Sequence, residues 1–266
     1  MMTDSPETEQ QGQSAPTTTP TKLALVQGQA VLALAQRELK GYFESPTAYV
    51  ALIVFYLMAG YLYTATVFLS NLATVQAFSE TVPLLLAFLV PALTMGLVSE
   101  ELKSGTFETL ATLPLEDWDI TLGKFMGFAG VHLLTVAGLV FYPVLLSFLA
   151  NPTTGLDWGE TAGILLGLTL LGLMYGAIGL FASSLSRSQV VSFVIAFLLC
   201  FSFFIAGNLA RFTPGPAATL LEFVGLDAHL DTLAKGVLDS RDILYFASVT
   251  FAFLYLTVRR LQSRRL

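Results

Sequence analysis

The sequence predicts an all-α membrane protein that crosses the bilayer six times. Of its 266 residues, 55% are hydrophobic and only 12% are charged, whereas soluble domains carry about 25% charged residues. Several apolar runs of 18 or more residues contain no Asp, Glu, Lys or Arg, which is typical of transmembrane helices. Polar segments separate six such runs, so the chain is a polytopic helical membrane protein.

The N-terminal part is expected to lie outside the bilayer. Residues 1–21 are rich in Gln, Thr, Ser and Pro and lack the basic start and apolar core of a signal peptide. We interpret them as a disordered cytoplasmic tail. Residues 22–45 follow as an amphipathic helix, because apolar side chains recur there at offsets of three and four residues. These positions are Leu32, Ala35, Leu39 and Tyr42.

The amphipathic helix is expected to lie in the membrane interface. A helix packed on a soluble partner is the alternative. Ser45-Pro46 ends the helix, because the residue before a proline is pushed out of the α region.

The six-span domain covers residues 46–258. Its spans have the approximate bounds 48–69, 81–98, 125–149, 161–185, 190–207 and 242–258. Pro91 and Pro143 lie inside the second and third spans, where a proline commonly kinks the helix. The fourth span holds two GxxxG patterns that permit close helix contact. They are formed by Gly163 with Gly167 and by Gly172 with Gly176.

The segment between the last two spans, residues 208–241, predicts one or two short helices that lie at the far membrane surface or dip into it. Its apolar residues fall on one helical face, namely Leu226, Leu230, Leu233 and Val237. A basic cytoplasmic tail, residues 259–266, ends the chain.

The distribution of Lys and Arg sets the orientation. Six spans place both termini on one side, and this side carries ten basic residues against three on the other. The ten are Lys22, Arg37, Lys40, Lys103, Lys124, Arg187, Arg259, Arg260, Arg264 and Arg265, and the three are Arg211, Lys235 and Arg241. Because cytoplasmic loops carry the excess of positive charge, both termini are expected in the cytoplasm and the protein in the cytoplasmic (inner) membrane.

The segment Ser99–Lys124 is strongly polar and lies between two apolar runs. Its eight charges are Glu100, Glu101, Lys103, Glu108, Glu116, Asp117, Asp119 and Lys124. One charge at the bilayer centre costs roughly 2.5–3.5 kcal/mol even on the most permissive scale, so this segment stays out of the lipid. We interpret it as the handle by which a soluble partner moves the membrane part. A solvated loop without a partner is the alternative.

Several kinds of chemistry have no sequence signal. The spans hold no Asp, Glu, Lys or Arg well inside them, which argues against transport driven by an ion gradient. The histidine in the third span, His132, is more simply a hydrogen-bonded packing residue. Motifs for a P-loop, a zinc site or a serine nucleophile do not occur, so no catalytic, cofactor-binding or metal-binding residues are predicted.

The overall charge excludes a further class. A net charge of −6 argues against a nucleic-acid partner.

The chain has the architecture expected of a transporter, but its sequence shows no energy source of its own. A cytoplasmic partner is expected to supply the energy.

The polar segment reads Glu100-Glu101, Gly105-Thr106, Glu108, Leu110, Leu113-Pro114 and Leu122-Gly123-Lys124-Phe125. This pattern resembles the first cytoplasmic loop of ABC-2-type permeases, in particular the gliding-motility-associated and multidrug-export branch. Similar pieces are Ser45-Pro46 before the first span, Leu89–Met95 in the second, and Gly179-Leu180-Phe181 near the turn between spans four and five. The resemblance covers nearly all of residues 30–260, and it does not specify a substrate.

The resemblance implies a transport component and not an enzyme. The chain would be the permease subunit of an ABC transporter, in particular an exporter, that works by ATP-driven alternating access. ATP would be bound by separate cytoplasmic ABC ATPase subunits, so this chain needs no cofactor. A second permease subunit, identical or different, would complete the membrane part within the lipid. An accessory extracytoplasmic subunit is left open.

The resemblance also assigns a coupling helix between spans two and three. The residues carried over are Glu100, Glu101, Gly105, Thr106, Glu108, Leu110, Leu113 and Pro114. Arg187 and Gln189, in the turn after span four, are expected to form a second cytoplasmic contact. Leu113-Pro114 ends the coupling helix, and the acids Glu116, Asp117 and Asp119 fall at the start of the next helix, where the helix dipole favours them.

Two other functions are consistent with the sequence. A membrane scaffold of a motility or secretion complex would share the fold without transporting anything, and a neighbouring ATPase gene would argue against it. A polytopic membrane enzyme would need polar residues converging inside the bilayer, and the spans hold very few. The apolar spans favour lipid-like or amphipathic cargo without identifying it.

Overall fold

The computed structural model describes residues 20–70, 75–107, 115–149, 157–210 and 212–265. Within these ranges the regular structure is entirely helical. Six segments are long and apolar enough to cross a membrane, at Pro46–Thr66, Phe78–Ser104, Asp117–Phe148, Trp158–Leu185, Gln189–Ala210 and Ser240–Arg264. The predicted fold class and number of spans are confirmed. The expected disordered tail lies almost wholly outside the described residues.

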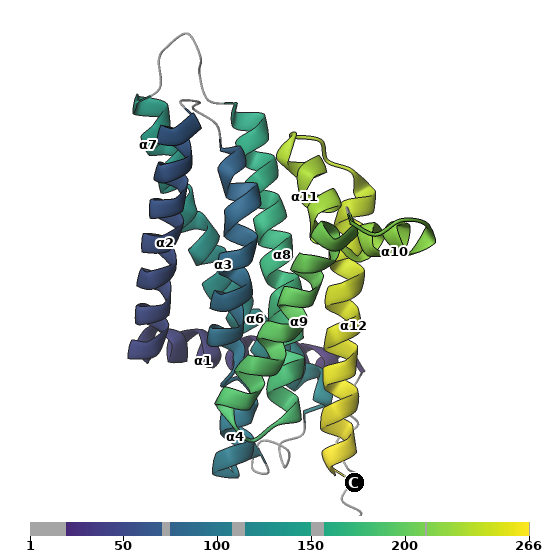
Figure 1. The fold of residues 1–266 in the computed structure, drawn as a ribbon. Helices are drawn as coiled ribbons and strands as arrows, with labels where there is room; N and C mark the ends of the chain where they lie inside the picture. Colours follow the sequence, from purple (N-terminus) through teal and green to yellow (C-terminus); the bar gives the residue numbers. More distant parts are fainter. Residues whose placement is uncertain (1–19, 71–74, 108–114, 150–156, 211, 266) are drawn as a thin grey trace, which may run out of the picture.

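Helix α8 (Trp158–Leu185) is the central element of the bundle. It is packed between α3 (Gln76–Thr94), α6 (Asp117–Leu139), α9 (Gln189–Ala210) and α12 (Ser240–Arg265) (Figure 1). Two thirds of its most apolar stretch (67%) is buried, against 22% for α2 (Pro46–Ser70) and for α9. The outer helices therefore present apolar faces to their surroundings, as expected for a protein in lipid.

The glycines of α8 bring the neighbouring helices close. A Cβ added at Gly172 would overlap the ring of His132, and one at Gly176 would overlap the ring of Phe128. The predicted tight packing of the glycine-rich span is thus present. His132 is enclosed in this contact, where its Nε2 lies 3.3 Å from the carbonyl oxygen of Leu168. His132 is a packing residue in this structure.

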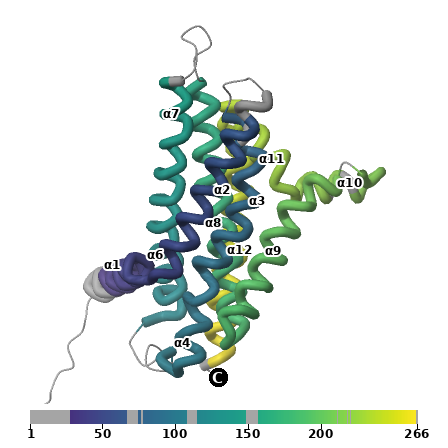
Figure 2. The backbone as a smooth tube through the Cα atoms, turned by 60° about the vertical axis from the view of Figure 1, so that its left-hand side comes forward, coloured from purple at the N-terminus to yellow at the C-terminus, as the bar shows by residue number. Residues whose placement is uncertain are grey.

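Helix α1 (Pro20–Glu44) runs across the long helices near the end that carries α4 (Figure 1), and Figure 2 shows it nearly end-on beside α6. It packs on glycines of α6, because Leu34 contacts Gly123 and Leu39 contacts Gly130. Leu32, which we placed on the apolar face of this helix, is exposed. Ala35 of the same face is buried, and so is Leu34, which the apolar pattern did not include. The expected position of this helix in the membrane interface stays a prediction.

Two of the spans are interrupted. The second stops at Thr94, and the chain turns through residues 95–98 before α4 (Ser99–Ser104) begins. The third breaks between α6 and α7 (Phe141–Leu149), because Pro143 has no N–H to bond the carbonyl of Leu139. Helix α6 begins at Asp117, where Glu116 and Asp119 form a capping box. The predicted acidic helix start is therefore confirmed.

Two short helices occupy the opposite end, as predicted. They are α10 (Pro216–Val224) and α11 (Leu226–Ala234) (Figure 1). Leu226, Leu230 and Leu233 are buried on one face of α11. Val237, expected on the same face, is exposed, because the helix ends at Ala234 and Gly236 adopts a positive φ of 71°. The prediction for Val237 is wrong.

Candidate functional site

The predicted contact segments meet at one end of the bundle. Glu100 of α4 accepts a hydrogen bond from Gln189 at the start of α9, with 3.2 Å between Oε2 and Nε2. These residues are 89 positions apart in the chain. Around them lies a surface cavity of about 480 Å³, which we call the α4–α9 surface. It is lined by Glu100, Lys103, Ser186, Arg187, Ser188, Gln189 and Val190.

The backbone at the end of α4 depends on glycine. Gly105 caps the helix with a φ of 76°, a conformation that side chains with a Cβ rarely adopt. The Ser104 hydroxyl donates to the carbonyl oxygen of Glu100 at 2.9 Å and lies 2.8 Å from the hydroxyl of Thr106. Gly105 and Thr106 thus form a defined turn at the exposed end of α4.

Glu101 points into the protein, unlike its neighbour Glu100. Only 9% of the residue is exposed. Its Oε1 lies 2.8 Å from Nζ of Lys124 on α6 and 3.3 Å from Nη2 of Arg37 on α1. Glu101 therefore joins α4 to the membrane part and does not face a partner in this structure.

Lys124 is the centre of this ion-pair cluster. The residue is 1% exposed, and its ammonium also donates to Oε1 of Glu38 at 3.0 Å and to the carbonyl of Leu97 at 2.6 Å. One buried cation thus connects α1, α6, α4 and the turn between α3 and α4. Breaking such a buried pair typically costs about 3–5 kcal/mol, because the remaining charges stay buried without compensation.

A second connection ties the α3–α4 turn to the central helix. The Ser183 hydroxyl of α8 accepts from the backbone amides of Val98 and Ser99, both at 3.0 Å. It donates in turn to the carbonyl of Met95 at 2.9 Å. All three backbone groups lie in or next to the helix break. This hydroxyl supplies partners for backbone groups that the interrupted helix leaves without their usual ones.

Helix α1 is fixed at its end by Tyr42. Its hydroxyl donates to the carbonyl oxygen of Leu93 at 2.8 Å. Burial, and secondarily the negative charge of Glu38, raise the pKa of the Tyr42 phenol above its usual value. The neutral donor form is therefore favoured, and α1 stays attached to the end of α3.

The structure brings six of the predicted site residues to one end of the bundle. Five of them lie at or beside the surface of this end, namely Glu100, Gly105, Thr106, Arg187 and Gln189, and Glu101 lies beneath it. The other predicted coupling residues, Glu108, Leu110, Leu113 and Pro114, lie outside the described residues. Among the residues that are described, no group of three or more His, Cys, Asp or Glu is placed to hold a metal ion.

Sequence reasoning missed the residues that hold α4 in place. Lys124 appeared as a charge excluded from lipid, as one of the ten basic residues and as part of a motif, but not as a residue that holds α4, and Glu38 and Ser183 were given no role. The one available signal was the position of Lys124 inside the Leu122-Gly123-Lys124-Phe125 motif. Nothing in the sequence paired it with Glu38, which lies 86 positions away.

Six apolar spans, a helix lying across the bundle and a polar surface at one end are the features of a polytopic membrane protein. The family model described as ABC-2 family transporter protein matches residues 8–257. The chain belongs to this family, and it is a permease subunit of an ABC transporter, a transport component whose family membership implies association with an ATPase subunit. The comparison with curated proteins finds no match.

Proposed function

We propose that this chain is the permease subunit of an exporter in the cytoplasmic membrane, driven by a separate ABC ATPase that docks on the α4–α9 surface. The termini and this surface face the cytoplasm in this proposal, in line with the ten-to-three distribution of basic residues. ATP binding and hydrolysis take place on the partner. The permease contributes the moving path through the membrane.

The observation that carries the proposal is the convergence of α4 with the turn before α9. A docking ATPase would contact both segments at once, because Glu100 and Gln189 are hydrogen-bonded across them. The exposed side chains there offer charges of both signs, with Glu100 and Lys103 on α4 and Arg187 on the turn. Charged rims of this kind give specificity and orientation to protein–protein contacts.

The ion-pair cluster explains how a displacement of α4 would be transmitted to the membrane helices. Lys124 connects α4 to α1 and α6, and Ser183 connects the α3–α4 turn to α8. A displacement of α4 therefore moves these elements together or breaks a buried polar contact. Alternating access needs two states a few kcal/mol apart, and differential binding of the ATPase to α4 could bias them.

The proposal is tested with paired charge reversals at the two ends of the molecule. Lys103→Glu with Arg187→Glu alters the α4–α9 surface, and Lys235→Glu with Arg241→Glu makes the same charge change at exposed positions of the opposite end. Co-purification with a partner ABC ATPase, and the stimulated ATP hydrolysis of that ATPase, are measured for both.

The first pair should lose ATPase binding and stimulation, whereas the second should keep them. Equal retention by both pairs would overturn the docking assignment. Binding of the ATPase without any transport of candidate cargoes would favour the scaffold alternative.

A further inference from the structure

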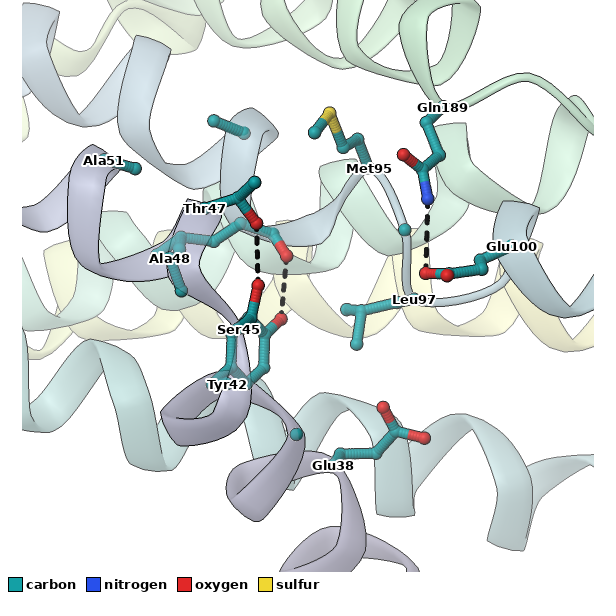
Figure 3. Close-up of a pocket in the computed structure, with 14 residues that line it drawn as sticks. Glu38, Tyr42, Ser45, Thr47, Ala48, Ala51, Met95, Leu97, Glu100 and Gln189 are labelled. Carbon is teal, nitrogen blue, oxygen red and sulfur yellow. Dashed lines mark hydrogen bonds between the residues drawn. The ribbon is translucent and has the colours of Figure 1, made fainter.

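A second cavity lies beside the α4–α9 surface, on the side of helix α1 (Figure 3). Its volume is about 290 Å³, at the lower end of the ~300–1,000 Å³ that ligand pockets occupy. It opens between the end of α1, the start of α2, the α3–α4 turn and the first residue of α9. We call it the α1 cavity.

The walls of the α1 cavity have two different characters. Carboxylates of Glu38 and Glu100 line one part, and the hydroxyls of Ser45 and Thr47 line another (Figure 3). Small and apolar side chains, among them Ala51, form the wall next to α2. None of the lining residues is Lys, Arg or His. The cavity therefore offers hydrogen-bond acceptors and negative charge beside an apolar surface.

The negative charge is only partly compensated by neighbouring cations. Glu38 shares the single ammonium of Lys124 with Glu101, and Arg37, with 62% of its side chain exposed, pairs with Glu101. Glu100 has the Gln189 amide as partner, and no cation among the described residues lies within 4 Å of its carboxylate.

The basic group next to the cavity is Lys124, because its ammonium binds Glu38 and the carbonyl of Leu97, and both of these residues line the cavity. Lys103 and Arg187 line the neighbouring α4–α9 surface and do not line the α1 cavity. The raised pKa of the buried Tyr42 phenol, to which the charge of Glu38 contributes, agrees with a negative field at this wall. An added cation in the cavity would relieve that field.

We propose that the α1 cavity binds the ammonium headgroup of an amphiphile. The carboxylates and hydroxyls would accept its N–H groups, and charge-assisted bonds of this kind are the stronger ones. The adjoining methylene groups would lie against Ala51 and its neighbours. The volume suits a headgroup and excludes a whole lipid, so the acyl part would remain outside, next to α1. A role of this cavity in cargo uptake rests on the proposed transport function. The binding of an ammonium headgroup there does not depend on that function.

Binding is tested on the purified full-length chain in a nonionic detergent at pH 7, without any ATPase. Decylammonium, decyl sulfate and butylammonium are titrated and followed by microscale thermophoresis. Decylammonium should bind about tenfold more tightly than decyl sulfate, a ratio that corresponds to ~1.4 kcal/mol. Binding by butylammonium of similar strength would assign the site to free amines, and binding only by decylammonium would assign it to membrane amphiphiles.

Three variants locate the site. Glu100→Gln removes a cavity charge and keeps an acceptor for Gln189, and it should weaken decylammonium binding about tenfold. Glu44→Gln removes the same charge from an exposed position of α1 outside the cavity and should change nothing. Ala51→Phe should abolish binding by filling the apolar wall. Equal affinity for decyl sulfate, or equal effects of Glu100→Gln and Glu44→Gln, would overturn the proposal. The ATPase docking assignment would stand in either case.

Discussion

Replacement of Lys124 by methionine tests the ion-pair cluster that holds α4. The substitution keeps the length and apolar volume of the side chain and removes the ammonium. Glu38 and Glu101, whose side chains are 15% and 11% exposed, then lose their shared buried cation. The carbonyl of Leu97 also loses its donor at 2.6 Å. Removing one member of a buried ion pair costs about 3–5 kcal/mol.

The loss is measurable as a fall in thermal stability. In a chain of this size each kcal/mol corresponds to roughly 2–4 °C, so Lys124→Met should lower the unfolding temperature by about 6–20 °C in detergent. Lys103→Met, which removes an exposed ammonium from α4, should change the free energy of unfolding by no more than about 0.5 kcal/mol.

A triple variant separates charge from packing. Lys124→Met combined with Glu38→Gln and Glu101→Gln leaves no buried carboxylate without a cation, so it should regain most of the stability that the single variant loses. An unfolding temperature of Lys124→Met within about 2 °C of the parent protein would mean a loss of no more than about 1 kcal/mol. That result would refute the reasoning. A triple variant no more stable than the single one would refute it as well.

Three further substitutions probe the connections around α4 and α8. Ser183→Ala leaves the amides of Val98 and Ser99 without their acceptor, which costs about 1–3 kcal/mol for each orphaned group. Calorimetry should show that it destabilises the protein more than Ser184→Ala, which loses only a bond to Phe181 in its own helix. Gly172→Ala pushes a Cβ into the ring of His132 and should lower the free energy of unfolding by about 1–3 kcal/mol. Adding His132→Ala should restore part of that stability, and Gly28→Ala, where the added Cβ meets no atom within 4 Å, should have little effect. Chemical unfolding that shows no restored stability in the double variant would contradict the contact. The Cβ of Gly105→Ala meets no neighbour, but the residue must adopt a φ of 76°, which costs about 1–2 kcal/mol. Gly105→Ala should therefore reduce ATPase stimulation, and Gly105→Asn should reduce it less. Equal stimulation by both variants and the parent protein would show that the turn has no role in coupling.

The fold was predictable because lipid imposes a simple rule. A span needs ~20 apolar residues in one helix, and α2, α8 and α9 follow directly from such runs. The start of α6 was also readable, because Glu116 and Asp119 form a local capping box. These signals lie within one turn or one helix, where sequence spacing translates directly into geometry.

The support of α4 was not predictable, because it depends on pairs far apart in the chain. Charge alone placed Lys124 outside the lipid, yet Lys124 is buried inside the protein with Glu38 and Glu101. The packing of α1 on α6 was not predictable for a similar reason. The glycines of α6, and not the period of α1, decide that Leu34 faces inward and Leu32 outward.

The proposed docking of an ATPase on the α4–α9 surface is tested most directly by site-specific cross-linking. A photoreactive benzoylphenylalanine replaces Lys103 on α4, and a control replaces Arg241 at the exposed opposite end. Each variant is co-expressed with a partner ABC ATPase and irradiated in membranes. The account predicts a permease–ATPase adduct from position 103 and none from position 241. Absence of an adduct from position 103 while the two proteins still co-purify, or equal adducts from both positions, would contradict it.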